Sequence, residues 1–198
     1  MKKVIAMILT VLIALMPAAA LAQSEPSSWA KNEVDTFAAD FLAAANGAID
    51  YAAPITRAQF AIVMLNVYGS VSGVEIPQMT IENPFVDCND PLVVTAYGLG
   101  LVRGVSDNEF APDEPITREA IATMIYRLAA SFVGDMDFEL PELSEFKDAD
   151  KVSDWAEDGV KLCVAAGIIK GTDKGLLDPT ANCTVEQALI IAKRIRNM

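Results

Sequence analysis

The chain has 198 residues with 27 acidic and 15 basic side chains, no histidine and three cysteines, and its formal charge is −12 at neutral pH. An acidic chain of this kind is not expected to bind nucleic acid, because phosphate contacts require basic patches. The absence of histidine removes the commonest general base and the commonest metal ligand.

Residues 1–22 have the pattern of a secretory signal peptide. Lys2 and Lys3 precede an apolar run over residues 4–16, and Ala20-Leu21-Ala22 is a small-x-small cleavage site. The apolar run is too short for a comfortable membrane span. We therefore expect a secreted mature chain with no membrane span and no anchor of its own.

The mature sequence repeats itself. Residues 88–131 align with residues 155–198 at a constant offset of 67, without a gap, and Pro54-Ile55-Thr56-Arg57 matches Pro115-Ile116-Thr117-Arg118. We predict three copies at residues 27–68, 85–131 and 146–196. Connectors at 69–84 and 132–145, rich in Ser, Gly, Pro and acids, separate them. We do not expect separate domains.

Each copy is predicted to form two helices, so the fold class is all-α. The second helix begins after a threonine cap in every copy, at Thr56, Thr117 and Thr184. Gln59 and Gln187 complete capping boxes in the first and third copies, whereas the second copy lacks this partner. Apolar stripes follow each cap, and one helix pair cannot bury them, so the copies must pack on one another.

The first helices have less uniform signals. Asp90-Pro91 is an N-cap followed by proline at the first helical position, where proline is tolerated. In the third copy, Ser153 is the expected N-cap of a helix that contains Trp155, and Gly167 is placed to end it.

Arg57 and Arg118 each follow the cap threonine of a second helix. The positive end of the helix dipole lies there, so a cation is unfavourable by about 0.3–1 kcal/mol. One interpretation is an anion site, in which free backbone N–H groups and the guanidinium face a carboxylate or phosphate. The alternative is a salt bridge to an acid of a neighbouring copy, for instance Asp87 or Asp148.

Trp29 and Trp155 open the first helices of copies one and three. Such a flat aromatic side chain can stack on a sugar ring, but tryptophan at a helix start is more often packed in the core. The loops around Gly104 and Gly171 lack the acid spacing of a calcium loop, so no metal site is expected. No pair of carboxylates stands out for glycoside hydrolysis, and we expect neither an enzyme nor a cofactor.

Cys163 and Cys183 both fall in the third copy, at positions that are apolar in the other copies. A disulfide between them would stabilise the fold by about 3 kcal/mol. The alternative is a pair of buried free thiols that act as small hydrophobic side chains.

These motifs resemble the S-layer homology (SLH) family. The resemblance rests on Ile55-Thr56-Arg57-Ala58-Gln59 and Ile116-Thr117-Arg118-Glu119-Ala120, on Phe85-Val86-Asp87 and Phe146-Lys147-Asp148, on Trp155-Ala156, and on Gly167-Ile168-Ile169-Lys170-Gly171. It implies a pseudo-threefold helical bundle with grooves between copies. In the family, such grooves bind anionic secondary cell-wall polymers non-covalently, often through a pyruvylated sugar.

The resemblance also implies roles for particular residues. Arg57 and Arg118 would pair with the acidic group of the sugar. The other residues implied to form the grooves are Thr56, Thr117, Trp29, Trp155, Asp87, Asp148, Gly104 and Gly171. The third copy has Val185 in place of the arginine, so one or two working grooves are expected.

The sequence thus predicts a protein of the cell surface or cell wall whose partner is an anionic cell-wall glycan. The alternative is a structural interaction protein of the same surface that binds a protein partner.

Overall fold

The computed structural model describes residues 24–76, 81–134 and 139–198, so the predicted signal peptide lies outside the described residues. Within these ranges the chain is all-α, as predicted, with isolated β-bridges but no β-sheet. The helices are α1 (Thr36–Asn46), α2 (Arg57–Ser72), α3 (Pro91–Gly98), α4 (Arg118–Val133), α5 (Glu157–Ala165) and α6 (Val185–Arg196), with 3-10 turns η2 (Ala149–Lys151) and η3 (Asp154–Ala156). None of the described helices is long and apolar enough to cross a bilayer.

The second helices begin where the threonine caps predict. The Thr56 hydroxyl accepts the Gln59 amide at 3.2 Å while the Gln59 side chain accepts the Thr56 amide at 3.0 Å, and Thr184 forms the same capping box. Thr117 accepts only the Ala120 amide at 3.3 Å, because alanine has no side chain to return the bond. Caps of this kind stabilise a helix by about 1 kcal/mol.

The first helices follow the predictions less closely. Asp90 caps α3 and Pro91 is its first residue, as predicted. The helix expected after Ser153 begins later, at Glu157, and a 3-10 turn containing Trp155 precedes it. Ser153 makes no cap bond because its amide and hydroxyl both donate to the Glu119 carboxylate, at 3.0 and 3.1 Å.

Trp29 does not open a helix either, since α1 begins seven residues later, at Thr36, after an Asp35 cap. Helices α2 and α4 extend to Ser72 and Val133, beyond the predicted ends of their copies. The central parts of both connectors lie outside the described residues, so the exact repeat boundaries stay a prediction.

The three copies meet in a closed ring of backbone hydrogen bonds. The residue before each cap threonine takes part: Ile55 donates to Cys183 at 2.9 Å, Cys183 to Ile116 at 3.1 Å, and Ile116 to Ile55 at 3.0 Å. All three residues are fully buried. Isolated β-bridges link the same three segments in pairs.

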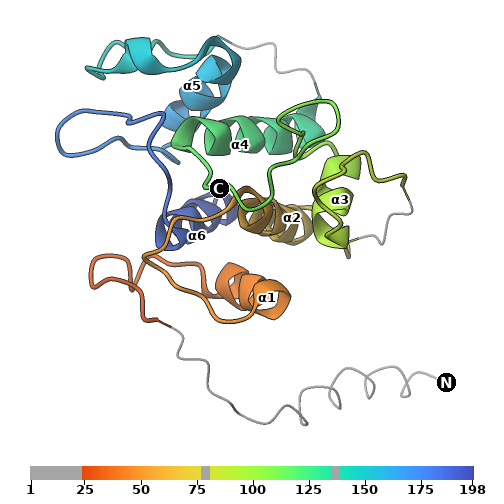
Figure 1. Ribbon diagram of the computed structural model, residues 1–198. Coiled ribbons are helices and arrows are strands. Elements are labelled where there is room, and N and C mark those ends of the chain that lie inside the picture. Colours follow the sequence, from red (N-terminus) through yellow and green to blue (C-terminus); the bar gives the residue numbers. More distant parts are fainter. Residues whose placement is uncertain (1–23, 77–80, 135–138) are drawn as a thin grey trace.

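The helices around this ring are arranged in layers (Figure 1), with α2 and α6 in the centre, α1 on one side, and α4 and α5 on the other. Helix α2 packs against both α4 and α6, whereas α4 and α6 do not pack together in the described residues. Because the packing is unequal, the pseudo-threefold bundle stays a prediction.

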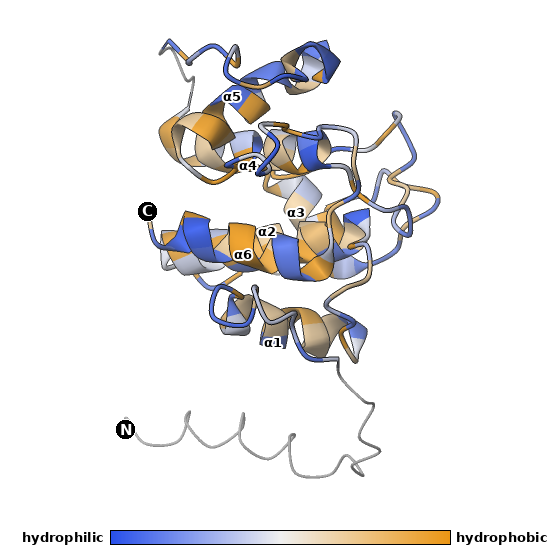
Figure 2. Ribbon diagram, turned by 90° about the vertical axis from the view of Figure 1, so that its left-hand side faces the viewer, coloured by the Kyte–Doolittle hydropathy of each residue, from blue (hydrophilic) through white to orange (hydrophobic). Residues whose placement is uncertain are grey.

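The predicted apolar stripes face the interior. Figure 2 shows hydrophilic and hydrophobic bands along α6, as expected for a helix with one buried face. The stripe residues of α2 and α4 are all buried: Phe60, Val63, Met64, Val67, Ile121, Met124, Ile125 and Leu128. One core cluster joins all three copies, which explains why no copy has to bury its stripe alone.

The suggested disulfide is not formed. Cys163 and Cys183 are free thiols, and so is Cys88, and all three are buried. Cys183 belongs to the central ring and Cys163 lies on α5, and both side chains are part of the same core cluster. Burial raises the pKa of both the Cys163 and the Cys183 thiol to about 12.

Candidate functional site

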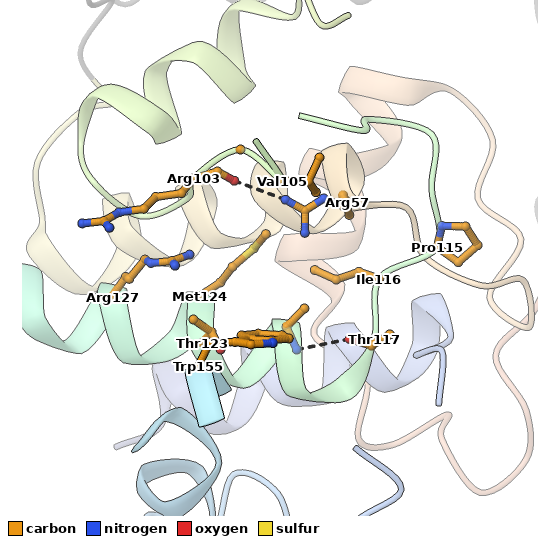
Figure 3. Close-up of a pocket in the computed structure, with 12 residues that line it drawn as sticks. Arg57, Arg103, Val105, Pro115, Ile116, Thr117, Thr123, Met124, Arg127 and Trp155 are labelled. Atoms are coloured by element: carbon orange, nitrogen blue, oxygen red, sulfur yellow. Dashed lines mark hydrogen bonds between the residues drawn. The ribbon is translucent and has the colours of Figure 1, made fainter. Parts of the chain in front are cut away.

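Two grooves of the same construction lie between the copies. The first groove, of about 470 Å³, is lined by Arg57, Arg103, Gly104, Val105, Pro115, Ile116, Thr117, Ala120, Thr123, Met124, Arg127 and Trp155 (Figure 3). The second groove, of about 170 Å³, is lined by Trp29, Arg118, Ile168, Ile169, Lys170, Gly171, Gln187, Ile190, Ile191 and Arg194. Each groove combines three cations, one tryptophan and one loop glycine, and residues from all three copies contribute to it.

The arginine that follows Thr56 or Thr117 reaches across to the loop of the next copy. Arg57 donates its Nε to the Phe110 carbonyl at 2.9 Å and its Nη2 to the Arg103 carbonyl at 3.2 Å. Its guanidinium also lies 5.1 Å from the centre of the Phe110 ring. Arg118 donates its Nε to the Leu177 carbonyl at 2.8 Å in the same way. These bonds fix the direction of each side chain and leave terminal guanidinium nitrogens for a ligand.

The backbone N–H groups at these helix starts are not available to an anion, which corrects one part of the anion-site interpretation. The Arg57 amide donates to Glu114 O at 2.9 Å, and the Ala58 amide donates to Pro112 O at 3.0 Å. The corresponding amides of the second copy are bound likewise: Arg118 to Ala181 O at 3.0 Å and Glu119 to Pro179 O at 2.9 Å. Only the guanidinium groups can therefore receive a ligand at these positions.

The alternative interpretation, a salt bridge to Asp87 or Asp148, is also wrong. None of the ion pairs in the described residues includes Arg57 or Arg118. Burial lowers the pKa of Arg57 from its ordinary value, and the nearby charge of Asp87 only partly opposes this effect. Among the residues that the structure describes, the Arg57 guanidinium therefore has no ion-pair partner.

Asp87 and Asp148 instead hold the loops that receive the arginines. The Asp87 carboxylate accepts the amides of Phe110 and Ala111, both at 2.8 Å, and Ala111 has a left-handed φ of 56°. The Asp148 carboxylate binds the matching turn, accepting the amides of Leu177 at 2.8 Å and Asp178 at 2.9 Å. Neither aspartate lines the two grooves, so each acts on its groove through the loop.

The hydrogen bonds from backbone amides to Asp87 and Asp148 favour the ionised form of each carboxylate. The Phe110 amide is the main reason that the pKa of Asp87 lies below its ordinary value. Burial raises the pKa of Asp148, but its bonds to backbone amides outweigh burial and lower the pKa overall.

Both tryptophans are exposed, so the expectation of core packing is wrong. Trp29 is 58% exposed and Trp155 is 60% exposed, and each lines a groove. Buried glutamates fix the backbone beside them: Glu119 accepts from Ser153, and Glu186 accepts from the amide and hydroxyl of Ser27 at 2.9 and 3.0 Å. An exposed indole held in this way offers a flat apolar face to a ligand.

Close contacts leave no room for a side chain at the loop glycines Gly104 and Gly171. A Cβ on Gly104 would lie 2.5 Å from the carbonyl oxygens of Ser106 and Glu109, and one on Gly171 would lie 2.6 Å from the Phe146 ring. Of the cap threonines, Thr117 lines the first groove, whereas Thr56 lies at a separate hollow beside α1.

Four cations in the grooves were not singled out from the sequence: Arg103, Arg127, Lys170 and Arg194. The repeat alignment contained the signal, because an offset of 67 places Arg103 on Lys170 and Arg127 on Arg194. No sequence rule showed that these positions face the same space as Arg57 and Arg118.

The third interface between copies, where α6 begins, has no equivalent set of cations among the described residues. The second helix of the third copy begins with Val185 instead of arginine. On α2, the position that corresponds to Arg127 is Asn66, which is 3% exposed and whose Oδ1 has no partner among the described residues. The position aligned with Trp155 is the buried Cys88.

No group of three or more Cys, Asp or Glu side chains that could hold a metal ion occurs in the described ranges. None of the described residues that line the two grooves is acidic. The grooves therefore have the chemistry to bind an anion with an apolar or ring-shaped neighbour, in a protein that is otherwise strongly acidic.

Comparison with known proteins gives a family match. The model of the S-layer homology domain matches residues 93–122, within the second predicted copy, and residues 145–189, which lie in the third predicted copy apart from residue 145. The "Endoglucanase" of Bacillus sp. (strain KSM-635) is 31% identical over 138 residues, which cover 68% of this chain and 14% of that protein.

Two further relatives are proteins of cell surfaces. The "Surface-layer 125 kDa protein" of Lysinibacillus sphaericus is 29% identical over 197 residues, covering 93% of this chain and 16% of that protein. The "Cell surface protein" of Thermoanaerobacter kivui is 26% identical over 138 residues, covering 67% and 18%. The chain thus spans less than a fifth of the length of each of these relatives.

Proposed function

Because the chain belongs to the S-layer homology family, we propose that it attaches to the cell envelope non-covalently, by binding an anionic cell-wall polysaccharide in its two basic grooves. The observation that carries this proposal is the composition of the grooves. Each brings together three cations and an exposed tryptophan, with no acid among its described lining residues, in a chain whose formal charge is −12.

The proposed ligand follows from the groups that face the grooves. A charge-assisted hydrogen bond from a guanidinium to a carboxylate contributes about 1.5–3 kcal/mol. The indole of Trp155 or Trp29 can cover the apolar face of a sugar ring. A sugar that carries its acid on the ring satisfies both requirements, and a pyruvylated sugar is the form that the family resemblance implies.

The proposed location is the cell surface, with export directed by the predicted signal peptide. The names of the relatives from Lysinibacillus sphaericus and Thermoanaerobacter kivui support a surface location. The similarity to the endoglucanase covers only 14% of that protein, so it gives no reason to assign hydrolase activity to this chain. We therefore propose a binding protein and not an enzyme.

Co-sedimentation with purified wall sacculi tests the proposal. The parent protein should sediment with the sacculi, and Arg57→Ala/Arg118→Ala should bind at least about tenfold more weakly, because each arginine contributes a charged hydrogen bond. Lys31→Ala/Lys151→Ala is the matched control, since it removes the same charge from exposed positions outside the grooves. Equal loss in both double variants would mean that only net charge matters.

Two treatments of the sacculi separate the other functions. Acid extraction of the secondary polymer should abolish binding, whereas retained binding would indicate peptidoglycan or a surface protein as the partner. Release of reducing sugar from untreated sacculi would contradict the assignment as a non-enzymatic protein.

A further inference from the structure

We infer that the first groove binds a saccharide with two acidic groups, one at Arg57 beside Trp155 and the second at a pair formed by Arg103 and Arg127; this inference rests on the function proposed above. Figure 3 shows the Arg103 and Arg127 side chains together at one end of the groove, with Met124 between them and Arg57. The groove thus has two separate basic positions.

Arg127 is the residue that points to a second acid. It lies on α4 and is half-buried, but its guanidinium has no hydrogen bond and no ion pair among the described residues. Its pKa is lowered by burial, and the charges of Arg103 and Arg57 lower it further. Among the described residues this half-buried cation faces other cations and no counter-charge, and an oxyanion would supply one.

The position of Arg103 supports the pairing. Its side chain is exposed and makes no hydrogen bond in the described part of the chain, although its carbonyl accepts from Arg57. Of the two neighbouring arginines, Arg103 acts more strongly on Arg127 than Arg57 does. An oxyanion placed between Arg103 and Arg127 would reduce the repulsion between them and accept hydrogen bonds from both.

The second groove differs at these same positions. Arg194 corresponds to Arg127, but it donates Nη1 to the Ile168 carbonyl at 2.7 Å and is therefore already engaged. Ile190 and Ile191 replace Thr123 and Met124, and the groove has about 170 Å³ instead of about 470 Å³. The second groove therefore receives a single acidic group, and the two grooves are not equivalent.

The test is an NMR titration that observes the Nε–Hε resonances of the arginines. Acetate and inorganic phosphate serve as separate probes, so that a preference for carboxylate or phosphate becomes visible. In the parent protein and in Arg57→Gln, at least one probe should shift the Arg103 and Arg127 resonances. In Arg127→Gln the affinity measured at Arg103 should fall at least tenfold, whereas Arg194→Gln should leave it unchanged.

Two results would overturn the inference: no probe shifts either resonance, or Arg127→Gln leaves the affinity at Arg103 intact. Because the Arg127 side chain has no hydrogen bond or ion pair with any residue that the structure describes, Arg127→Gln should keep the melting temperature of the parent. If it does not, Arg127→Lys replaces it as the test variant, and this variant should bind both probes more weakly while preserving the charge.

Sacculus binding separates this inference from the proposed function. Arg127→Gln should weaken binding at least tenfold, and Arg194→Gln should weaken it less. If Arg57→Gln reduces binding while Arg127→Gln does not, the second acidic group is refuted and wall attachment stands. If neither Arg127→Gln nor Arg57→Ala/Arg118→Ala changes binding, both proposals fail.

Discussion

The buried carboxylate of Glu119 provides a quantitative test of how the tryptophan is positioned. Glu119 is 4% exposed, and its two oxygens accept the amide and hydroxyl of Ser153 at 3.0 and 3.1 Å. In Glu119→Gln, the side-chain amide group must face one of these donors, so one charged hydrogen bond is lost and the other is weakened. We expect a loss of about 2–4 kcal/mol in the free energy of unfolding.

For a chain of this length, such a loss corresponds to a fall in melting temperature of roughly 5–15 °C. Thermal unfolding followed by circular dichroism measures it, and the fluorescence of the nearby Trp155 should change in the folded state. Glu157→Gln is the matched control, because Glu157 pairs with Lys161 at the surface and its side chain is 51% exposed. The control should change stability by less than about 1 kcal/mol.

Ser153→Ala completes the test as a double-mutant cycle with Glu119→Gln. The hydroxyl contributes one of the two bonds, so the single variant should lose about 1–2 kcal/mol, and the double variant should lose less than the sum. Additive losses, or a change in Glu119→Gln within about 0.5 kcal/mol of the parent, would refute the reasoning.

Three further outcomes are expected. Trp29→Ala and Trp155→Ala should weaken sacculus binding. Because both side chains are exposed, each variant should change the free energy of unfolding by less than about 0.5 kcal/mol. A loss of stability equal to the loss of binding free energy would contradict this. Gly171→Ala should destabilise the protein by about 1–3 kcal/mol, because φ at this residue is 71° and the new Cβ would lie 2.6 Å from the Phe146 ring. Urea unfolding measures the change, and an unchanged midpoint would contradict the observed turn. The pKa values of Asp87 and Asp148 are lowered from 3.8, so their contribution to stability should be complete above about pH 5 and disappear as the pH falls through the folded-state values. Asp87→Asn/Asp148→Asn should flatten this acid limb of the stability curve, and an unchanged limb would count against the role of the aspartates.

The sequence identified residues of the grooves correctly but did not predict their contacts correctly. Arg57 and Arg118 were singled out as an anion site, yet the backbone amides expected to assist them are occupied by carbonyls of the next copy. Asp87 and Asp148 were expected either to pair with the arginines or to shape the grooves. They form no ion pair with the arginines in the described residues, and they hold the turns whose carbonyls the arginines bind.

The sequence by itself determined the features that depend on neighbouring residues. Threonine caps, the Asp90-Pro91 helix start and the apolar stripes depend on residues within one or two turns of each other, and the structure has them where they were predicted. The constant offset between copies likewise revealed a repeated all-α unit, because repeated local signals repeat the local structure.

Only the tertiary structure decided which distant groups share a space. Ser153 was expected to cap a helix, but Glu119, 34 residues earlier in the chain, takes both of its donors. Arg127 and Arg57 face one groove because the copies close into a ring, and local signals carry no information about this closure. The charge of the grooves and the exposure of the tryptophans arise from contacts between copies, so they followed from the fold and not from the pattern of any one segment.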